Sequence, residues 1–299
     1  MSGTEPTLTA TPAPALSPAD GAPTAAGPRL GVWSLLRSEL GLIGGRRRNQ
    51  FGLLVLAAVP VLIAVVTRMS ASRGGAGASF FGSITSNGLF VALAALTVEM
   101  PMFLPLAMAM LSGDAIAGEA NLGTLRYLLT VPVSRTRLVL VKYLALCVGA
   151  LWGLAVVVGV GGIVGVALFG TGPMTTLSGT QIGFGDALVR LALAMLYLGA
   201  GLAALAAVGL FVSTLTEQPI AATIGVMIFT ITSWILAGIP QVSWLHPYLL
   251  VSWFMSFADL YRDPVWTAQI ANGLTLFAGY AVVFVSLAWA RCSTKDITS

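Results

Sequence analysis

The chain has 299 residues, of which 57% are hydrophobic and only 9% are charged, whereas soluble domains carry roughly 25% charged residues. So few charges cannot cover a water-exposed surface, so the composition predicts an integral membrane protein and excludes a soluble domain. The formal net charge is +4, but the basic residues stand at the ends of apolar runs and form no stripe with interleaved aromatic residues. This pattern argues against nucleic acid as a partner.

Residues 1–28 are rich in proline, alanine and threonine. Such a composition cannot bury enough apolar surface to fold. We therefore expect a disordered tail over 1–28 and a transmembrane domain over 29–299.

The segment 29–43 carries apolar residues at helical spacing. They are Trp33, Leu36, Leu40 and Ile43. This spacing predicts an amphipathic helix that lies in the membrane interface. A basic cluster follows, formed by Arg46, Arg47 and Arg48, and we expect it to anchor the chain to anionic lipid headgroups.

Six later runs are long and apolar enough to be membrane-spanning helices, which need ~20 residues each. They lie near 51–67, 88–112, 141–169, 187–212, 219–238 and 272–290. The stretch 245–258 is also apolar, but Pro247 interrupts it and aromatic residues enrich it. We interpret it as an interfacial or re-entrant segment. The predicted fold is an all-α polytopic membrane protein with six transmembrane helices.

Basic residues orient the spans, because cytoplasmic loops carry an excess of lysine and arginine. With six spans and both termini in the cytoplasm, eleven of the fifteen basic residues lie inside. The four outside are Arg68, Arg73, Arg190 and Arg262. A seventh crossing at 245–258 would leave the two sides roughly even, so six spans give the better account.

Glu99 lies within the second span, where a charge costs roughly 2.5–3.5 kcal/mol on insertion scales. Pro101 and Pro105 follow it, so the helix is expected to kink and leave backbone carbonyls free. Two interpretations remain open. Glu99 is either a polar group on a substrate path or subunit interface, or a protonated side chain hydrogen-bonded within the bundle.

The cytoplasmic segment 113–142 holds a second helical pattern. A helix is predicted to start at Asp114, with Glu119 near its positively polarised end. Pro132 cannot continue this helix, and Ser134 can cap the next one. The basic residues Arg135, Arg137 and Lys142 then stand at a helix start, where the dipole disfavours cations. Either anionic lipid or an acidic partner surface must therefore favour them.

The ordered string in this segment resembles the type-2 ATP-binding cassette (ABC) transporter permease family. It consists of Asp114, Gly118, Glu119, Gly123, Thr124, Leu125, Arg126, Leu128, Leu129, Pro132, Val133, Ser134, Arg135 and Lys142. The resemblance implies a coupling helix that docks into a cytoplasmic ATPase. The residues it implies for that contact are Asp114, Glu119, Thr124, Arg126 and Arg135. Alternatively, these are ordinary loop charges that keep an interfacial helix wetted.

Several features expected of an enzyme are missing from the sequence. The two lysines, Lys142 and Lys295, follow no glycine-rich loop, so the phosphate-binding motif G-x-x-x-x-G-K-[ST] does not occur. His246 is the sole histidine, which excludes a multi-histidine metal site. Together with the resemblance, this implies a transport subunit without cofactors of its own, while ATP and magnesium bind to a partner ATPase.

The resemblance further implies a second permease copy or a paralogue, since six spans form half of a transport path in that family. Gly161 and Gly165 would allow close helix packing within one chain or between two. The predicted function is the permease subunit of an ATP-driven exporter in a bacterial cell membrane. The alternatives are an ATP-independent secondary transporter or channel that uses Glu99, and a membrane scaffold without transport activity.

Overall fold

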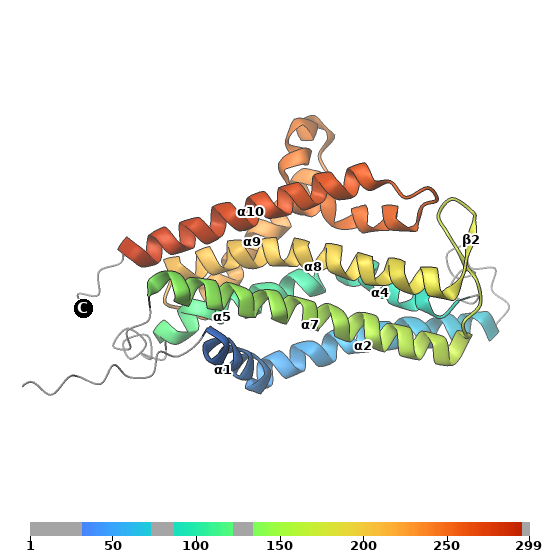
Figure 1. Ribbon diagram of the computed structural model, residues 1–299, viewed down its shortest axis with the longest axis horizontal. Helices are drawn as coiled ribbons and strands as arrows, with labels where there is room; N and C mark the ends of the chain where they lie inside the picture. The colour runs from blue at the N-terminus through green and yellow to red at the C-terminus, as the bar shows by residue number, and fades with distance from the viewer. Residues whose placement is uncertain (1–31, 73–86, 122–133, 295–299) are drawn as a thin grey trace, which may run out of the picture. The chain divides into compact units, whose positions relative to one another are not determined.

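The computed structural model describes residues 32–72, 87–121 and 134–294, and these residues are almost entirely helical (Figure 1). The chain divides into two units, residues 1–31 and 32–299, and the described residues all lie in the second. The predicted tail over 1–28 and the loop 122–133 lie outside the described residues. The elements are α1 (Val32–Gly45), α2 (Arg47–Ser72), α4 (Leu89–Glu99), α5 (Phe103–Asn121), α7 (Arg135–Phe169), β1 (Met174–Thr175), β2 (Gln181–Ile182), α8 (Phe184–Leu215), α9 (Pro219–Ala237), the 3₁₀ helices η1 (Pro240–Tyr248) and η2 (Leu250–Tyr261), and α10 (Thr267–Thr294).

Five helices in the described ranges are long and apolar enough to cross a membrane, namely α2, α7, α8, α9 and α10. The pair α4 and α5 makes a sixth crossing if it is counted as one broken span. This confirms an all-α, multi-pass membrane protein. The predicted cap is also present, since the hydroxyl of Ser134 accepts a hydrogen bond from the backbone N–H of Arg137 and α7 begins at Arg135.

The second span is broken where its prolines predict a kink. The axes of α4 and α5 differ by 62°. Pro101 and Pro105 have no backbone N–H, so the carbonyls four residues before them lose their helical donors. The predicted helix start at Asp114 is wrong, because α5 continues without a break to Asn121. Gly113 serves close packing there instead, since a Cβ atom at this position would lie 2.6 Å from Oγ1 of Thr223 in α9.

Helix α8 forms the centre of the described bundle. In its most apolar stretch 67% of the residues are buried, against 11–28% in the four other unbroken spans. It lies between α7 and α10 in Figure 1 and also packs against α5, α9 and η2. Tyr197 of α8 donates a hydrogen bond to the carbonyl of Trp253 at 2.8 Å and its ring packs on Phe277 of α10. These contacts fix η2 against the bundle.

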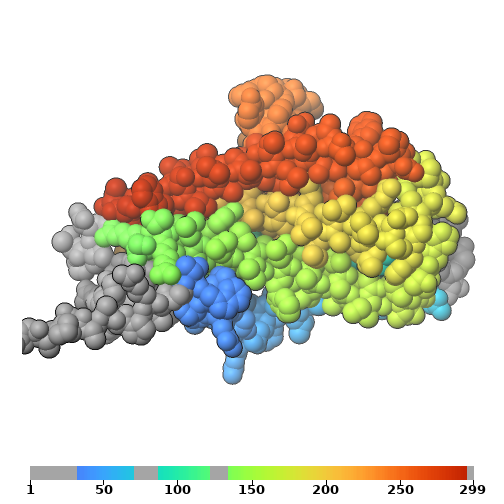
Figure 2. All heavy atoms as spheres, viewed as in Figure 1, coloured from blue at the N-terminus to red at the C-terminus, as the bar shows by residue number. Residues whose placement is uncertain are grey.

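The stretch predicted as interfacial or re-entrant forms η1 and η2. The 12 residues of η2 are fewer than the ~20 that a crossing helix needs. Phe254 and Phe257 of η2 are buried against the bundle. By contrast, η1 buries none of its residues, Trp244 is 71% exposed, and Figure 2 shows this segment projecting beyond α10.

Two glycines of α7 pack within the chain, against α4. A Cβ atom on Gly165 would lie 2.0 Å from the carbonyl oxygen of Gly88, and one on Gly161 would lie 2.8 Å from the Cα atom of Ala92. The backbones of the two helices therefore approach as closely as small residues allow.

Candidate functional site

Six charged residues meet where α1, α2, α5 and α7 converge, and we call them the charged junction. They are Glu39, Arg46, Arg48, Asp114, Glu119 and Lys142. Glu119 lies two residues before the end of α5, and Lys142 lies in the third turn of α7. The junction therefore sits at both ends of the segment 122–133.

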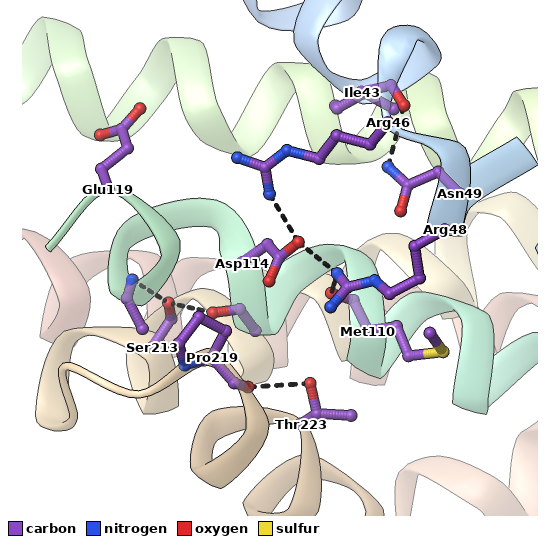
Figure 3. A network of polar contacts seen from close by, with 12 residues as sticks. Ile43, Arg46, Arg48, Asn49, Met110, Asp114, Glu119, Ser213, Pro219 and Thr223 are labelled. Carbon is purple, nitrogen blue, oxygen red and sulfur yellow. Dashed lines mark hydrogen bonds and ion pairs between the residues drawn. The ribbon is translucent and has the colours of Figure 1, made fainter. Parts of the chain in front are cut away.

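The first half of the junction ties α5 to the start of α2. The carboxylate of Asp114 forms ion pairs with Arg46, at 2.5 Å, and with Arg48 (Figure 3). Arg48 also donates a hydrogen bond to the carbonyl of Met110 at 3.2 Å. Cations are disfavoured at the start of a helix, so the carboxylate of Asp114 offsets the positive charges that open α2.

The second half is more deeply buried and joins three helices. The Nζ atom of Lys142 lies 2.5 Å from Oε1 of Glu119 in α5 and 3.1 Å from Oε1 of Glu39 in α1. The Lys142 side chain is only 1% exposed. A buried ammonium group is stable only when it is paired and hydrogen-bonded, so both acids hold Lys142 in its place.

Ser213 of α8 adds a neutral contact at the same end of the bundle (Figure 3). Its hydroxyl donates to the carbonyl of Gly113 at 2.9 Å and accepts from the backbone N–H groups of Ile116 and Ala117 at 3.1 and 2.9 Å. These bonds fasten α5 to α8 just before the segment 122–133.

The charged junction holds helices together through ion pairs. Its three cations and three acids balance in charge, and ion pairs join them across helix boundaries. Residues 32–72, 87–121 and 134–294 contain no group of three potential metal ligands. The ion pairs therefore join α1, α2, α5 and α7 next to both ends of the segment 122–133.

The structure brings together some of the predicted coupling residues. Asp114 and Glu119 both belong to the charged junction, whereas Thr124 and Arg126 lie outside the described residues. Arg135 stands apart and donates hydrogen bonds to the carbonyls of Cys292 and Ser293 at 2.7 and 2.9 Å, near the end of α10. Cations are favourable at that end of a helix. Contact of these residues with an ATPase stays a prediction.

Two of the three basic residues for which lipid or a partner was expected, Arg135 and Lys142, find acceptors inside the chain, and for Arg137 lipid or a partner stays a prediction. Lys142 is paired with two acids, and Arg135 with helix carbonyls. Within the predicted anchoring cluster, Arg46 and Arg48 are bound to Asp114, while Arg47 is exposed. Anchoring of this cluster to headgroups stays a prediction.

Sequence reasoning missed the pairing of Lys142 with Glu39 and Glu119. One signal could have pointed to it. Lys142 stands seven residues inside the apolar helix α7, and ionisable residues within such helices usually pair with one another. The sequence does not reveal which acids are close, because Glu39 lies 103 residues away from Lys142.

Glu99 lies at the end of α4, directly before the break. Its side chain is fully buried, and neither carboxylate oxygen has a hydrogen-bond partner among the described residues. The second interpretation of Glu99, a group hydrogen-bonded within the bundle, finds no such bond in this part of the chain. A role on a substrate path or subunit interface stays a prediction.

The amino-acid sequence is similar to one protein family and to two ABC transporter permeases. The sequence model of a family described as "Protein of unknown function (DUF2705)" matches residues 53–298. The chain is also 34% identical over 130 residues to the "Probable ABC transporter permease protein NosY" of Pseudomonas aeruginosa, and 33% identical over 130 residues to the protein of the same name from Stutzerimonas stutzeri. Each match covers 44% of this chain and 43% of the relative, so the chain spans less than half the length of these relatives.

Proposed function

This chain belongs to the DUF2705 family, and from that premise we propose that it is the membrane-spanning permease subunit of a type-2 ABC exporter. The similarity to the two NosY proteins, whose names state that they are probable ABC transporter permeases, is the observation that carries the proposal. The predicted coupling string at 114–142 supports the same class of transporter.

The charged junction supports a mechanical role for the segment 122–133. That segment leaves α5 two residues after Glu119 and enters α7 seven residues before Lys142. We propose that a cytoplasmic ATPase docks on it and that closure of two ATPase subunits pushes on the junction. The push would then move α1, α2, α5 and α7 together and drive alternating access.

The proposed complex contains partners that bind what this chain does not. A separate ATPase binds ATP and magnesium, because the sequence carries no phosphate-binding loop of its own. A second copy of the chain, or a paralogue, completes the transport path. We propose the bacterial cell membrane as its location, with both termini in the cytoplasm.

Co-purification tests the proposal. The tagged chain is extracted from its native membrane in a mild detergent, and bound proteins are identified by mass spectrometry. We expect a stoichiometric soluble ATPase. Arg126→Glu should reduce its recovery about tenfold, as expected when a charge contact across an interface is reversed.

The matched control reverses a charge at the opposite end of the bundle. Asp186 is exposed in the first turn of α8, so Asp186→Lys should leave recovery of the ATPase unchanged. Charge reversal at Glu119 is not used to test docking, because a lysine there would face Lys142 and disturb the fold. Equal losses from Arg126→Glu and Asp186→Lys would contradict docking on the segment 122–133.

A second candidate function follows from Glu99, which is fully buried with no hydrogen-bond partner in the described part of the chain. An ATP-independent transporter or channel could use this carboxyl group as a proton or ion site beside the broken helix. The same co-purification separates the two functions. Recovery of the chain alone across several detergents would favour the second, and Glu99→Gln should then alter transport without unfolding the protein.

A further inference from the structure

The segment η1 projects sideways from the bundle, about halfway between its two ends (Figures 1 and 2). None of its residues is buried, and the side chains of Trp244 and Tyr248 are largely exposed. The Nε2 atom of His246 lies 3.1 Å from the carbonyl oxygen of Leu236 and 3.3 Å from that of Ile239, around the end of α9. The projection is therefore fixed to α9, while Trp244 and Tyr248 remain uncovered.

Two hydrogen bonds give the depth of this segment in the membrane. The hydroxyl of Tyr280 in α10 donates to the carbonyl of Tyr248 at 2.9 Å. The hydroxyl of Tyr197 in α8 donates to the carbonyl of Trp253 at 2.8 Å. Tyr197 and Tyr280 each lie near the middle of the apolar run that predicts their span. The junction of η1 and η2 therefore lies near the middle of the bilayer.

The backbone of Trp244 lies at a similar depth. A 3₁₀ helix rises about 2 Å per residue, so the path from Trp244 to Tyr248 covers at most about 8 Å. The headgroups begin ~15 Å from the middle of a bilayer whose hydrocarbon core is ~30 Å thick. Tryptophan and tyrosine are common among headgroups, but this distance keeps the backbone of Trp244 within the hydrocarbon region.

Exposed polar groups at this depth need a cover. Pro247 has no N–H, so the carbonyl of Trp244, three residues before it, lacks its 3₁₀ donor. Ser243 adds an exposed hydroxyl group. Irregular backbone at membrane depth occurs only where protein buries it or where it lines a water-filled cavity. The exposed rings of Trp244 and Tyr248 favour protein, because both residue types are enriched at the centres of protein interfaces.

We propose that η1 is covered by a second copy of this chain, with Trp244 as the anchor of the contact. This inference rests on the second copy that the proposed function includes, and it names the surface through which the two copies meet. In a two-fold dimer, the commonest homo-oligomer, each chain presents the same surface to the other. Ile231 and Ile235 are exposed in the last two turns of α9, directly before η1. They give Trp244 of the second copy an apolar surface to pack on.

Photocrosslinking in the native membrane tests what covers η1. Full chains with two different tags are expressed together, and p-benzoyl-phenylalanine replaces Trp244 in both. Val282 of α10 is the matched control position, because it is 67% exposed and lies two residues from Tyr280, at the same depth. After illumination we expect a product that carries both tags from position 244, and loss of that product when the label is at position 282.

Purification through one tag, without illumination, measures separately whether two copies associate. Recovery of both tags without a crosslink at position 244 would overturn the proposed surface and leave the second copy in place. Recovery of one tag only, again without a crosslink, would overturn both. A crosslink at position 244 would stand even if no ATPase co-purifies with the chain.

Three further results would overturn the contact. They are equal yields of the doubly tagged product at positions 244 and 282, adducts of position 244 only with lipid, and adducts of position 244 only with another protein. Water at η1 is tested with Trp244→Cys in a background without Cys147 and Cys292. Reaction of this variant with a membrane-impermeant maleimide in intact cells would show a water-filled cavity in place of a second copy.

Discussion

Lys142 is the residue on which the charged junction depends most. Its side chain is 1% exposed, and the carboxylates of Glu119 and Glu39 both contact its ammonium group. Removing one partner from a buried ion pair leaves an uncompensated charge and costs roughly 3–5 kcal/mol. If an apolar residue replaced the lysine, the carboxylates of Glu119 and Glu39 would lose the opposite charge that stabilises them.

Lys142→Met is therefore expected to lower the free energy of unfolding by roughly 3–5 kcal/mol. The midpoint of thermal unfolding in detergent, followed by tryptophan fluorescence, measures the loss. The double variant Lys142→Met, Glu119→Gln removes the more buried of the two acids and should recover part of the stability. An unchanged midpoint for Lys142→Met would show that the ion pairs contribute nothing to the folded state.

Among the elements, α4 and α7 make the tightest backbone contact described. The Cβ atom of any residue other than glycine at position 165 would lie 2.0 Å from the carbonyl oxygen of the residue that precedes α4. That oxygen belongs to the backbone of Gly88 and cannot rotate away. The two helices would therefore have to separate, with a cost typical of overpacked interiors.

Gly165→Ala should accordingly destabilise the protein by about 1–3 kcal/mol. Gly159→Ala, on the same helix with open space around its added Cβ atom, should be neutral or raise stability by up to about 1 kcal/mol through its higher helix propensity. Thermal unfolding midpoints compare the two. Equal shifts for both variants would contradict close packing at Gly165.

Most of the helices and some of their boundaries could be predicted from the sequence. Hydropathy located the helices, Ser134 located the start of α7, and Pro101 with Pro105 located the broken span, because each of these signals is local. The predicted start at Asp114 is wrong because α5 continues through Gly113, which packs against Thr223 of α9. Helix starts depend on such contacts when no proline enforces them.

The candidate site could be predicted only in part. Asp114 and Glu119 were selected by resemblance, but their partners Glu39, Arg48 and Lys142 come from three other helices, and Arg46 lies between α1 and α2. Helix-dipole arguments consider only neighbours along the chain, so they sought the missing negative charge in lipid or a partner protein. For Lys142, tertiary packing supplies it within the chain through Glu39 and Glu119.

For the molecule as a whole, the distribution of basic residues predicts which side of the membrane each end of the bundle faces. The hairpin of β1 and β2 lies at the opposite end from α1 and the end of α10 (Figure 1). Of the fifteen basic residues, eleven are predicted on the α1 side. The hairpin should therefore face outward.

Cysteine labelling tests this orientation in a background without Cys147 and Cys292. Ser178, in the hairpin, and Gln218, between α8 and α9, are both exposed. Ser178→Cys should react with a membrane-impermeant maleimide in intact cells, whereas Gln218→Cys should react only after permeabilisation. The reverse pattern would place both ends of the bundle on the wrong side.

The charged junction lies near one end of the long helix α7, so a small rotation there corresponds to a large displacement at the other end. Its 35 residues form a rod about 52 Å long, so a tilt of about 10° around one end carries the other end through about 9 Å. Lys142 lies near one end, and at the other the carbonyl of Gly170 accepts a hydrogen bond from the backbone N–H of Gly88, at the start of α4, at 3.0 Å. In the proposed mechanism, a small rotation of α7 at the charged junction would therefore displace Gly170 and the start of α4 at the far end of the bundle.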